Sequence, residues 1–321
     1  MGESVKPFAL HLALILALAV ALAVLPPYPA TMLARILVLA VFAMGYNLAY
    51  GYTGLLSLGH ALFLAAGVFA AGLSAQFWGL SAGPALLLGV LAGGGMATTV
   101  GLLALRTAGV SFMIVTLMFA QAGYLTLLYF GPITGGDEGF TLPAASRVIL
   151  GFDLSTDTPR FVAALFLFAI GLLVSLALVR SPFGRSMVAM RENEERSRML
   201  GINPFAVKLA ALVISGLYAG AAGAAYALLF GYAGANFATI QYSILPMLYV
   251  LLGGAGTTIG PFLGALLMFV LIEGTSRLAR FWPVLEGMDY FMIGAALVVL
   301  VLFAPRGILG TLRERGRKWL P

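Results

Sequence analysis

Long stretches of apolar residues constrain this chain more than any other feature of its sequence. A helix needs roughly 20 apolar residues to cross the hydrocarbon core of a bilayer. Ten stretches reach or approach that length, and they cover residues 8–25, 32–50, 58–77, 84–105, 109–130, 161–179, 208–230, 241–254, 258–272 and 289–304. The sequence therefore predicts an all-α membrane protein that crosses the bilayer about ten times.

The scarcity of charge supports the same class of protein. Only 9% of the 321 residues are charged and 61% are hydrophobic, whereas a soluble domain carries about 25% charged residues. This balance excludes a soluble globular enzyme, a disordered chain and a nucleic-acid-binding domain. The chain has no cysteine and only two histidines, His11 and His60, so neither thiolate chemistry nor a histidine-based metal site is expected.

Two details of the count leave alternatives open. The first stretch follows Lys6 and could be a cleavable signal peptide, but it is long for one and lacks a good cleavage pattern, so we interpret it as a helix. The stretches 241–254 and 258–272 are short and separated by several glycines and Pro261. They are either two helices or one broken span. In both cases the whole chain, 1–321, is a single transmembrane domain.

The positions of the basic residues predict the orientation. With the N-terminus in the cytoplasm, 13 of the 18 Lys and Arg residues fall in internal segments and five in external ones, as the positive-inside rule requires. Both termini are therefore expected in the cytoplasm. The longest external loop covers 131–160, and the longest internal loop covers 180–207 and holds five arginines.

The long internal loop has the features of a docking element. Ser181-Pro182 is typical of a helix start. An amphipathic helix is predicted over 187–200, which Gly201 can end with a left-handed cap before Pro204 prevents continuation. The alternative is a solvated, positively charged loop. We favour a surface that docks onto a cytoplasmic partner, because topology alone does not require a capped helix.

The spans themselves contain few groups suited to chemistry. No P-loop, zinc-protease or nucleophile-elbow motif is present in the sequence, and ionisable residues are nearly absent from span centres, which argues against an ion-coupled carrier. The candidate translocation path therefore consists of weakly polar residues, namely Asn47, Ser57, His60, Thr116, Gln121 and Tyr124. Most Ser and Thr residues in membrane helices bond their own backbone carbonyls, whereas Asn47 and Gln121 are equally suited to an interhelical contact and to a pathway.

Glycines spaced four residues apart predict close helix packing. These pairs indicate nothing about the substrate, and they are Gly89/Gly93, Gly216/Gly220 and Gly260/Gly264. The glycine-rich stretches 51–59 and 253–260 are expected to be flexible points.

Several blocks of sequence resemble the permease subunits of branched-chain amino acid ABC transporters, in particular the M-type subunit of Liv systems. In chain order the blocks are GYNLAYGYTGLLSLGHALFLAAGVFAAGL (45–73), RTAGVSFMIVTLMFAQ (106–121), TGGDEG (134–139), SPFGRSMVAMRENEERSRMLGIN (181–203), LGGAGTTIGPFLGA (252–265) and APRGILG (304–310). Together they cover nearly the whole chain. They are less specific for substrate, because urea and short-amide permeases share most of them.

The resemblance implies an ABC importer permease fold and a subunit that moves branched-chain or other hydrophobic amino acids into the cytoplasm. Its implied partners are a homologous second permease subunit, two cytoplasmic ATPase subunits that bind ATP and Mg, and an external solute-binding protein. The implied location is the cytoplasmic (inner) membrane of a bacterium or archaeon. No cofactor, catalytic residue or metal is expected in this chain. The alternatives are the same machine carrying urea or short amides, a secondary carrier and, least of all, a membrane-embedded enzyme.

The resemblance also assigns roles to the loops. The family's coupling motif has an acid six residues before a glycine, which matches Glu195 and Gly201, and with Arg191 these residues are expected to couple the chain to the ATPase. The usual alanines after the acid are replaced here. Asp137 and Glu138 are expected to dock the binding protein, together with Asp153 and Asp157. The family fold relates helices two to five and seven to ten by inversion, which the count permits although no repeat is visible in the residues.

Overall fold

The computed structural model describes residues 2–149, 151–281 and 307–314 and the single positions 294, 298 and 302. These residues form helices α1 (Gly2–Val24), α2 (Pro27–Asn47), η1 (Leu48–Tyr52), α3 (His60–Trp78), α4 (Ala82–Ala104), α5 (Val110–Tyr129), α6 (Gly131–Thr134), η2 (Ala144–Arg147), α7 (Asp157–Arg180), α8 (Pro182–Glu192), α9 (Glu194–Met199), α10 (Pro204–Phe230), η3 (Ala235–Ala238), α11 (Ile240–Gly253), α12 (Gly260–Phe281) and α14 (Gly307–Glu314). The strands are β1 (Phe140–Thr141), β2 (Val148–Ile149), β3 (Phe152–Asp153) and β4 (Tyr232–Ala233).

The helices confirm an all-α, multi-pass architecture. By length and composition, six helices of the described chain can cross a membrane, namely α2 with η1, α3, α4, α5, α7 and α10. Three shorter apolar helices, at Phe8–Leu22, Ile240–Gly253 and Gly260–Gly274, match three more of the expected stretches. The expected span 289–304 lies almost entirely outside the described residues. Because α11 ends at Gly253 and α12 begins at Gly260, the two short stretches are separate helices.

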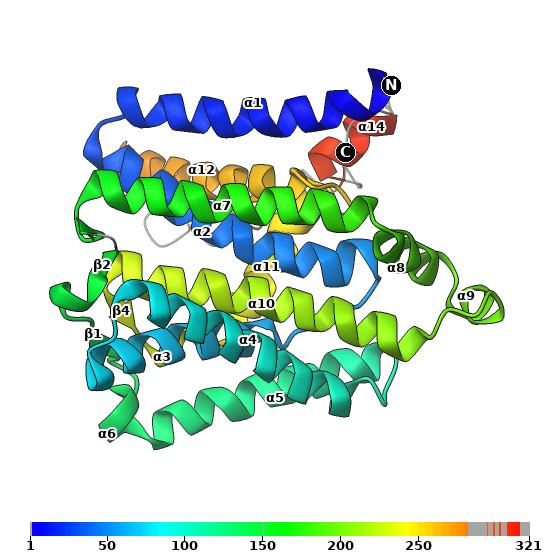
Figure 1. Ribbon diagram of the computed structural model, residues 1–321, viewed down its shortest axis with the longest axis horizontal. Helices are drawn as coiled ribbons and strands as arrows, with labels where there is room; N and C mark the ends of the chain where they lie inside the picture. The colour runs from blue at the N-terminus through cyan, green and yellow to red at the C-terminus, as the bar shows by residue number, and fades with distance from the viewer. Residues whose placement is uncertain are drawn as a thin grey trace.

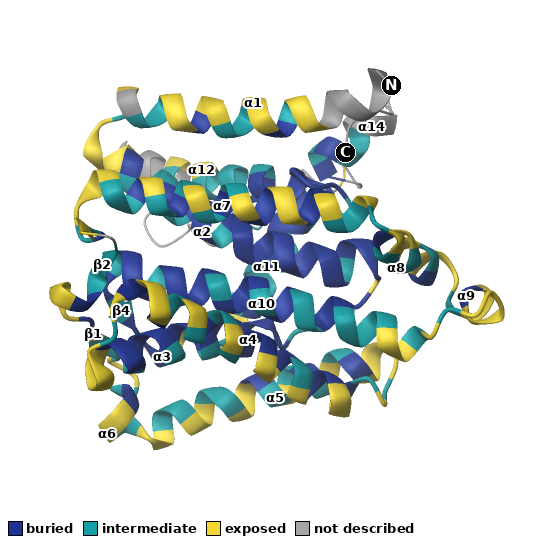
Figure 2. Ribbon diagram, viewed as in Figure 1, coloured by how far each residue is buried: buried dark blue, intermediate teal, exposed yellow. Residues whose placement is uncertain are grey.

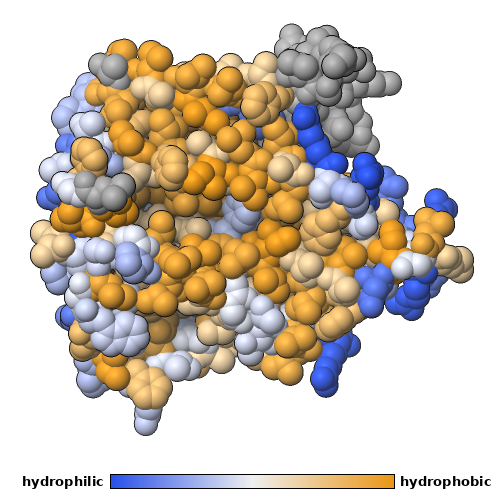
Figure 3. Space-filling view, in the orientation of Figure 1, coloured by the Kyte–Doolittle hydropathy of each residue, from blue (hydrophilic) through white to orange (hydrophobic). Residues whose placement is uncertain are grey.

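The bundle has two chemically different ends (Figure 1). At one end lie the N-terminus, α8, α9 and α14, and we call it the arm end. At the other lie α6 and the short strands, and we call it the strand end. Figure 3 shows a hydrophobic band over the helices and the most hydrophilic surface at the arm end around α8 and α9. This pattern is what a bilayer-spanning bundle requires.

Helix α2 forms the centre of the bundle. It packs against α7, α10, α11 and α12, and most of its length is buried (Figure 2). Most of its core side chains are apolar, including Leu37, Phe42 and Met44, each almost completely buried, and Asn47 is a buried polar exception. A helix that is this apolar is stable only when other helices or lipid surround it.

The predicted close packing at glycine pairs is confirmed for α4 and α10, which make the most extensive helix contact in the chain. A Cβ added to Gly93 would lie 2.5 Å from the carbonyl oxygen of Gly216, and one added to Gly220 would lie 2.4 Å from that of Gly89. The two backbones therefore touch, which only glycine allows. In a bilayer such van der Waals contact, rather than the hydrophobic effect, holds helices together.

A short internal repeat, missed in the sequence, appears once the helix ends are known. The sequence GYTG at 51–54 and the sequence GYAG at 231–234 each end a long helix. In both, the next α-helix begins nine residues after the first glycine, at His60 for α3 and, after the short helix η3, at Ile240 for α11. Since α2 and α10 end at opposite ends of the bundle, the two motifs lie at opposite ends as well.

The strands are confined to the strand end. Strands β1 and β4 pair antiparallel, with Phe140 opposite Ala233, and β2 and β3 form a hairpin with Val148 opposite Asp153. The β1–β4 pair ties the loop predicted at 131–160 to the connection between α10 and α11.

The helix expected over 187–200 is wrong in one respect, because two helices occupy this region. Asn193 is extended, with φ −161° and ψ 108°, and separates α8 from α9. Its side chain accepts a hydrogen bond from the backbone N–H of Arg196 at 2.9 Å and so caps α9. The predicted ends are confirmed, since the Ser181 hydroxyl caps α8 and Gly201 has φ +84°.

Candidate functional site

Two segments distant in sequence meet at the arm end of the core. The Asn47 side chain donates to the carbonyl oxygen of Thr257 at 2.8 Å and accepts from the backbone N–H of Gly256 at 3.0 Å. A Cβ added to Gly51 would lie 2.7 Å from the backbone nitrogen of Gly256. We call this meeting of the two glycine-rich stretches, at Asn47, Gly51, Gly54, Gly256 and Thr257, the glycine junction.

Arg191, at the end of α8, reaches into the glycine junction. Its Nη1 donates to the carbonyl oxygen of Gly51, and the same nitrogen lies 3.1 Å from the position of a Cβ on Gly256. A Cβ on Gly54 would be 3.3 Å from Cγ of Arg191. One arginine therefore contacts both glycine-rich stretches.

Helix α1 is bonded to the neighbouring loop. Nε2 of His11 lies 2.7 Å from Oγ1 of Thr258, and both residues are buried. Thr257 closes the loop from within by donating to the carbonyl oxygen of Gly254 at 2.7 Å. The described arm end of the core is thus held by polar contacts between segments far apart in the sequence.

Beyond α8 the chain projects from the bundle (Figure 1), and we call residues 193–203 the coupling arm. Lys208 bonds Glu194 at 2.5 Å and holds the base of the arm against α10. At the tip, Met199 and Leu200 are 87% and 74% exposed. Such exposure of large apolar side chains is typical of a surface that a partner covers.

The structure places the three predicted coupling residues in two locations. Arg191 lies at the glycine junction, whereas Glu195 is exposed on the arm and Gly201 ends it with its left-handed conformation. A Cβ on Gly201 would have no atom within 4 Å. Gly201 is therefore required by backbone conformation and not by crowding.

Four of the predicted path residues are buried and bonded within the chain. Asn47 belongs to the glycine junction, and Nε2 of His60 lies 2.7 Å from the Ser215 hydroxyl. The Thr116 hydroxyl donates to its own helix at Met113 and accepts from the backbone N–H of Leu58 at 3.2 Å. Ser57 accepts from the backbone N–H of Gly59. These bonds fix how α3 begins, and Nδ1 of His60 is the one atom of these four side chains that is buried without a hydrogen-bond partner in the described chain.

The other two predicted path residues lie on α5. Gln121 is exposed and Tyr124 half-buried, and α5 is the least buried of the six long helices. Its outward residues include Ile114, Met118 and Leu125. An exposed amide in the middle of an apolar helix would be costly against lipid, so this side of α5 is suited to contact with protein or a polar path.

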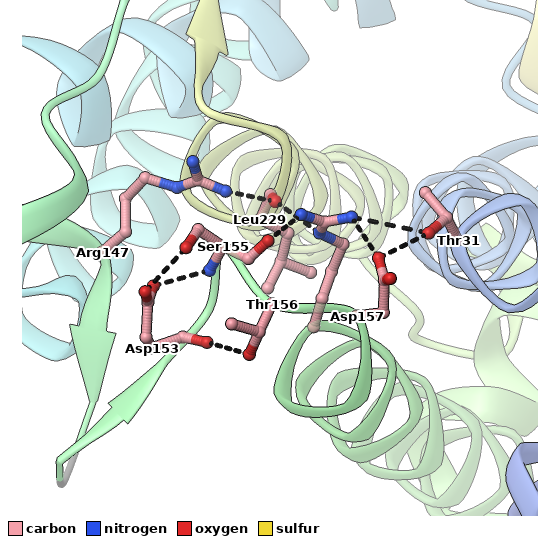
Figure 4. A network of polar contacts seen from close by, with 8 residues as sticks. Thr31, Arg147, Asp153, Ser155, Thr156, Asp157 and Leu229 are labelled. Atoms are coloured by element: carbon pink, nitrogen blue, oxygen red, sulfur yellow. Dashed lines mark hydrogen bonds and ion pairs between the residues drawn. The ribbon is translucent and has the colours of Figure 1, made fainter. Parts of the chain in front are cut away.

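At the strand end, two arginines bind the C-terminus of α10 (Figure 4). Arg147 donates to the carbonyl oxygens of Leu228 and Leu229 at 2.7 and 2.6 Å, and Arg160 donates to that of Leu229 at 3.0 Å. The last carbonyls of a helix lack intrahelical donors and carry partial negative charge, which cations stabilise. Burial, and then the neighbouring charge of Arg160, lowers the pKa of Arg147.

The acidic residues of the predicted docking loop separate into two groups. Asp157 pairs with Arg160 at 3.1 Å and accepts from Thr31. Asp153 accepts from the hydroxyl and the backbone N–H of Ser155, which hold the pKa of this carboxyl below its usual value. Asp137 and Glu138, by contrast, are exposed, and they remain the carboxylates best placed for a partner.

Sequence reasoning missed the roles of Arg147 and Arg160, which were counted only as external charges. A weak signal was available, because Arg147 and Arg160 both lie close in sequence to acidic residues, the first before the long helix α7 and the second in its first turn. Their acceptors, however, lie about 70 to 80 residues away in the chain, and no spacing rule joins these segments.

Comparison with known proteins gives a consistent result. Residues 28–302 match the family described as branched-chain amino acid transport system, permease component. The chain is 30% identical to the high-affinity branched-chain amino acid transport system permease protein LivM of Salmonella typhimurium, over 86% of this chain and 68% of that protein. It is 29% identical to LivM of Escherichia coli over the same shares. No solved structure matches.

More distant relatives share the permease class. A probable LivM of Methanocaldococcus jannaschii is 29% identical over 61% of this chain and 59% of that protein. The autoinducer 2 import system permease protein LsrC of Photorhabdus laumondii is 29% identical over 40% of this chain and 39% of that protein. These relatives are permease subunits and not enzymes, as the sequence predicts for this chain. The chain therefore belongs to the family of permease components of branched-chain amino acid transport systems.

Proposed function

We propose that this chain is the translocating subunit of an ATP-driven importer for branched-chain amino acids. The observation that carries the proposal is the contact of Arg191 with both glycine-rich stretches, because it joins the coupling arm to the core of a permease fold. The ATP and Mg needed for transport would bind in partner subunits. The relatives named for branched-chain amino acids cover most of the chain, which favours this substrate over urea or short amides.

In the proposed mechanism, an ATPase subunit binds the exposed tip of the coupling arm at Met199 and Leu200. ATP-driven closure of the two ATPases displaces the arm and, through the rigid helix α8, Arg191. Withdrawal of this guanidinium breaks its bond to Gly51 and separates the two glycine-rich stretches. Glycine lacks a side chain to hinder this change, and small movements at packed interfaces switch between discrete arrangements.

The proposed orientation places the arm end in the cytoplasm and the strand end outside. The excess of basic residues in the segments assigned to the arm end supports it. Asp137 and Glu138 are then available to an external solute-binding protein. We further propose that a second permease subunit covers α5, so that Gln121 and Tyr124 face a path between the two subunits and the amide is not left against lipid.

The coupling assignment is tested in vesicles that contain the permeases, the ATPases and the binding protein. Replacing Gly201 with leucine, or Glu195 with arginine, is expected to lower substrate-stimulated ATP hydrolysis and leucine uptake, while leucine binding to the binding protein stays unchanged. Normal coupling in both variants would remove the assignment. Uptake that continues after ATP depletion would instead favour a secondary carrier.

A further inference from the structure

Arg35 lies within a helix that can span a membrane and has no acidic partner among the described residues. It lies in α2, roughly 12 Å along the helix from Pro27 at the strand end. Its Nε is buried and has no hydrogen-bond partner, and the ion pairs among the described residues all involve other side chains. A charge in a membrane helix is costly, and it is retained chiefly where it serves a function.

The guanidinium of Arg35 lies against a group of aromatic rings. Its Cζ is 5.0 Å from the ring centre of Phe230 and 6.0 Å from that of Tyr226. Phe237 lies 4.9 Å from Tyr226 and 5.0 Å from Tyr242, measured between ring centres. We call these four aromatic residues, which come from α10, η3 and α11, the aromatic cage.

The aromatic cage contains polar groups that have no hydrogen-bond partner in the described chain. The hydroxyls of Tyr226 and Tyr242 form no hydrogen bond to a described residue, although both side chains are only half-buried. The charge of Arg35 acts on both tyrosines. A cation, two hydroxyls and apolar ring faces therefore lie close together.

The other arginines of the strand end differ from Arg35. Arg147 and Arg160 are bonded to carbonyl oxygens of α10, and Arg160 is also paired with Asp157. The carbonyl oxygens at the C-terminus of α10 explain the positions of Arg147 and Arg160. Cation–π contact alone is weak compared with the cost of desolvating a guanidinium, so packing does not account for Arg35.

We propose that Arg35 and the aromatic cage form a transient binding site for a free branched-chain amino acid entering from the strand end. The guanidinium binds the carboxylate, since this pair is geometrically matched. The branched side chain packs on the rings, and the ammonium group contacts the tyrosine hydroxyls and ring faces. This proposal rests on the proposed function, and it specifies the place where the amino acid is first held after release from the binding protein.

The site is expected to bind an amino acid only weakly, as transport requires. It offers a single cation and no acidic residue among its members, so an amino acid would be oriented but not retained. Because η3 packs against α5, the cage borders the helix whose exposed side we assign to the path. The amino acid can therefore pass from the cage to Gln121 and Tyr124 without crossing the packed core.

The first test measures leucine uptake in vesicles that contain the complete transporter and saturating leucine-loaded binding protein. Arg35→Met keeps an unbranched side chain that can pack on the rings, and it is expected to lower uptake roughly tenfold to a hundredfold, the value of a charged hydrogen bond. Arg35→Lys should recover part of the loss. Arg106→Met, which changes an exposed arginine between α4 and α5, should transport as the wild type does.

The second test distinguishes binding from a structural role. A diazirine analogue of leucine is activated by light during turnover, and labelled peptides are identified by mass spectrometry. The wild type should be labelled within 226–242, and Arg35→Met should abolish the label. Unchanged uptake in Arg35→Met, or label at the cage that does not depend on Arg35, would overturn the proposal. A wild type that imports no leucine would instead remove the proposed function.

Discussion

The glycine junction and the coupling arm are joined by one short helix, yet they are stabilised in opposite ways. At the junction, Asn47 and Arg191 bond backbone atoms of segments far away in the sequence, and glycines allow backbones to touch. On the arm, Asn193 caps α9, Glu194 bonds Lys208 of the following helix, and the tip is exposed. In the proposed function, the junction determines the state of the core, and the arm receives force from a partner subunit.

The largest difference is expected between two glycine-to-alanine substitutions. In Gly253→Ala the new Cβ would lie 1.7 Å from the carbonyl oxygen of Gly260. Backbone must move, and we expect a loss of more than about 3 kcal/mol, seen as little folded protein in the membrane. Gly201→Ala meets no atom within 4 Å and should cost about 1–2 kcal/mol for its left-handed conformation. Equal yields and melting temperatures would contradict the comparison.

Two asparagines provide the second test. Asn47→Leu leaves the N–H of Gly256 and the carbonyl of Thr257 without their partner, which should cost about 2–5 kcal/mol in stability. Asn193→Ala removes only a helix cap and should cost about 1 kcal/mol. Thermal unfolding in detergent compares them. If Asn193→Ala were the more damaging change, the arm and not the junction would be the stabilising element.

The exposed tip of the arm is expected to matter for assembly alone. Replacing Met199 and Leu200 together with serine removes two apolar side chains that a partner would bury, and should weaken ATPase binding roughly tenfold to a hundredfold. The stability of the isolated chain should change by less than about 0.5 kcal/mol. Pull-down of the ATPase measures the first effect and thermal unfolding the second. Unweakened assembly would show that the partner binds elsewhere.

Arg191 links the two regions, so its loss should uncouple them. Arg191→Gln removes a charged bond to the Gly51 carbonyl and is expected to lower leucine imported per ATP hydrolysed by roughly tenfold. Arg185→Gln changes an exposed arginine of the same helix and serves as the matched control. If both variants import as much leucine per ATP hydrolysed as the wild type does, Arg191 does not transmit movement from the arm to the junction.

The smallest effect is expected at the strand end. Asp137→Asn with Glu138→Gln removes two exposed charges and should raise the binding-protein concentration needed for half-maximal ATPase activity a few-fold. The effect should fade as ionic strength increases, because salt screens exposed charges. Asp157→Asn, in contrast, acts on a residue already paired within the chain. If the double variant behaves as the wild type at low salt, these carboxylates do not dock the partner.

The spans, the two ends of α8–α9 and the glycine packing could all be predicted from the sequence, because apolar length, capping residues and glycine spacing are local signals. Contacts between distant segments could not be predicted in this way. Asn47 was recognised as costly to bury, but nothing local shows that its partners are Gly256 and Thr257. The surroundings of Arg35 could not be predicted either, since the rings around it come from three other elements.

The break at Asn193 illustrates a finer limit. Apolar and charged residues from 187 to 200 fit one amphipathic helix, and Asn is only mildly unfavourable within helices. The same side chain is also an excellent cap. Whether Asn193 continues one helix or caps a second depends on the contact between Lys208 and Glu194 at the base of the arm. The local sequence pattern does not reveal that contact.

The central claim is that the glycine junction opens when the arm moves, and a distance measurement tests it most directly. The chain has no cysteine, so one cysteine can be introduced at Leu56 and another at Ala255, on the two sides of the junction. Each cysteine then carries one spin label. In the complete transporter, the distance between the labels should lengthen when ATP is bound, and Arg191→Gln should reduce that change. A distance that stays constant through the ATP cycle while leucine import continues would contradict the account.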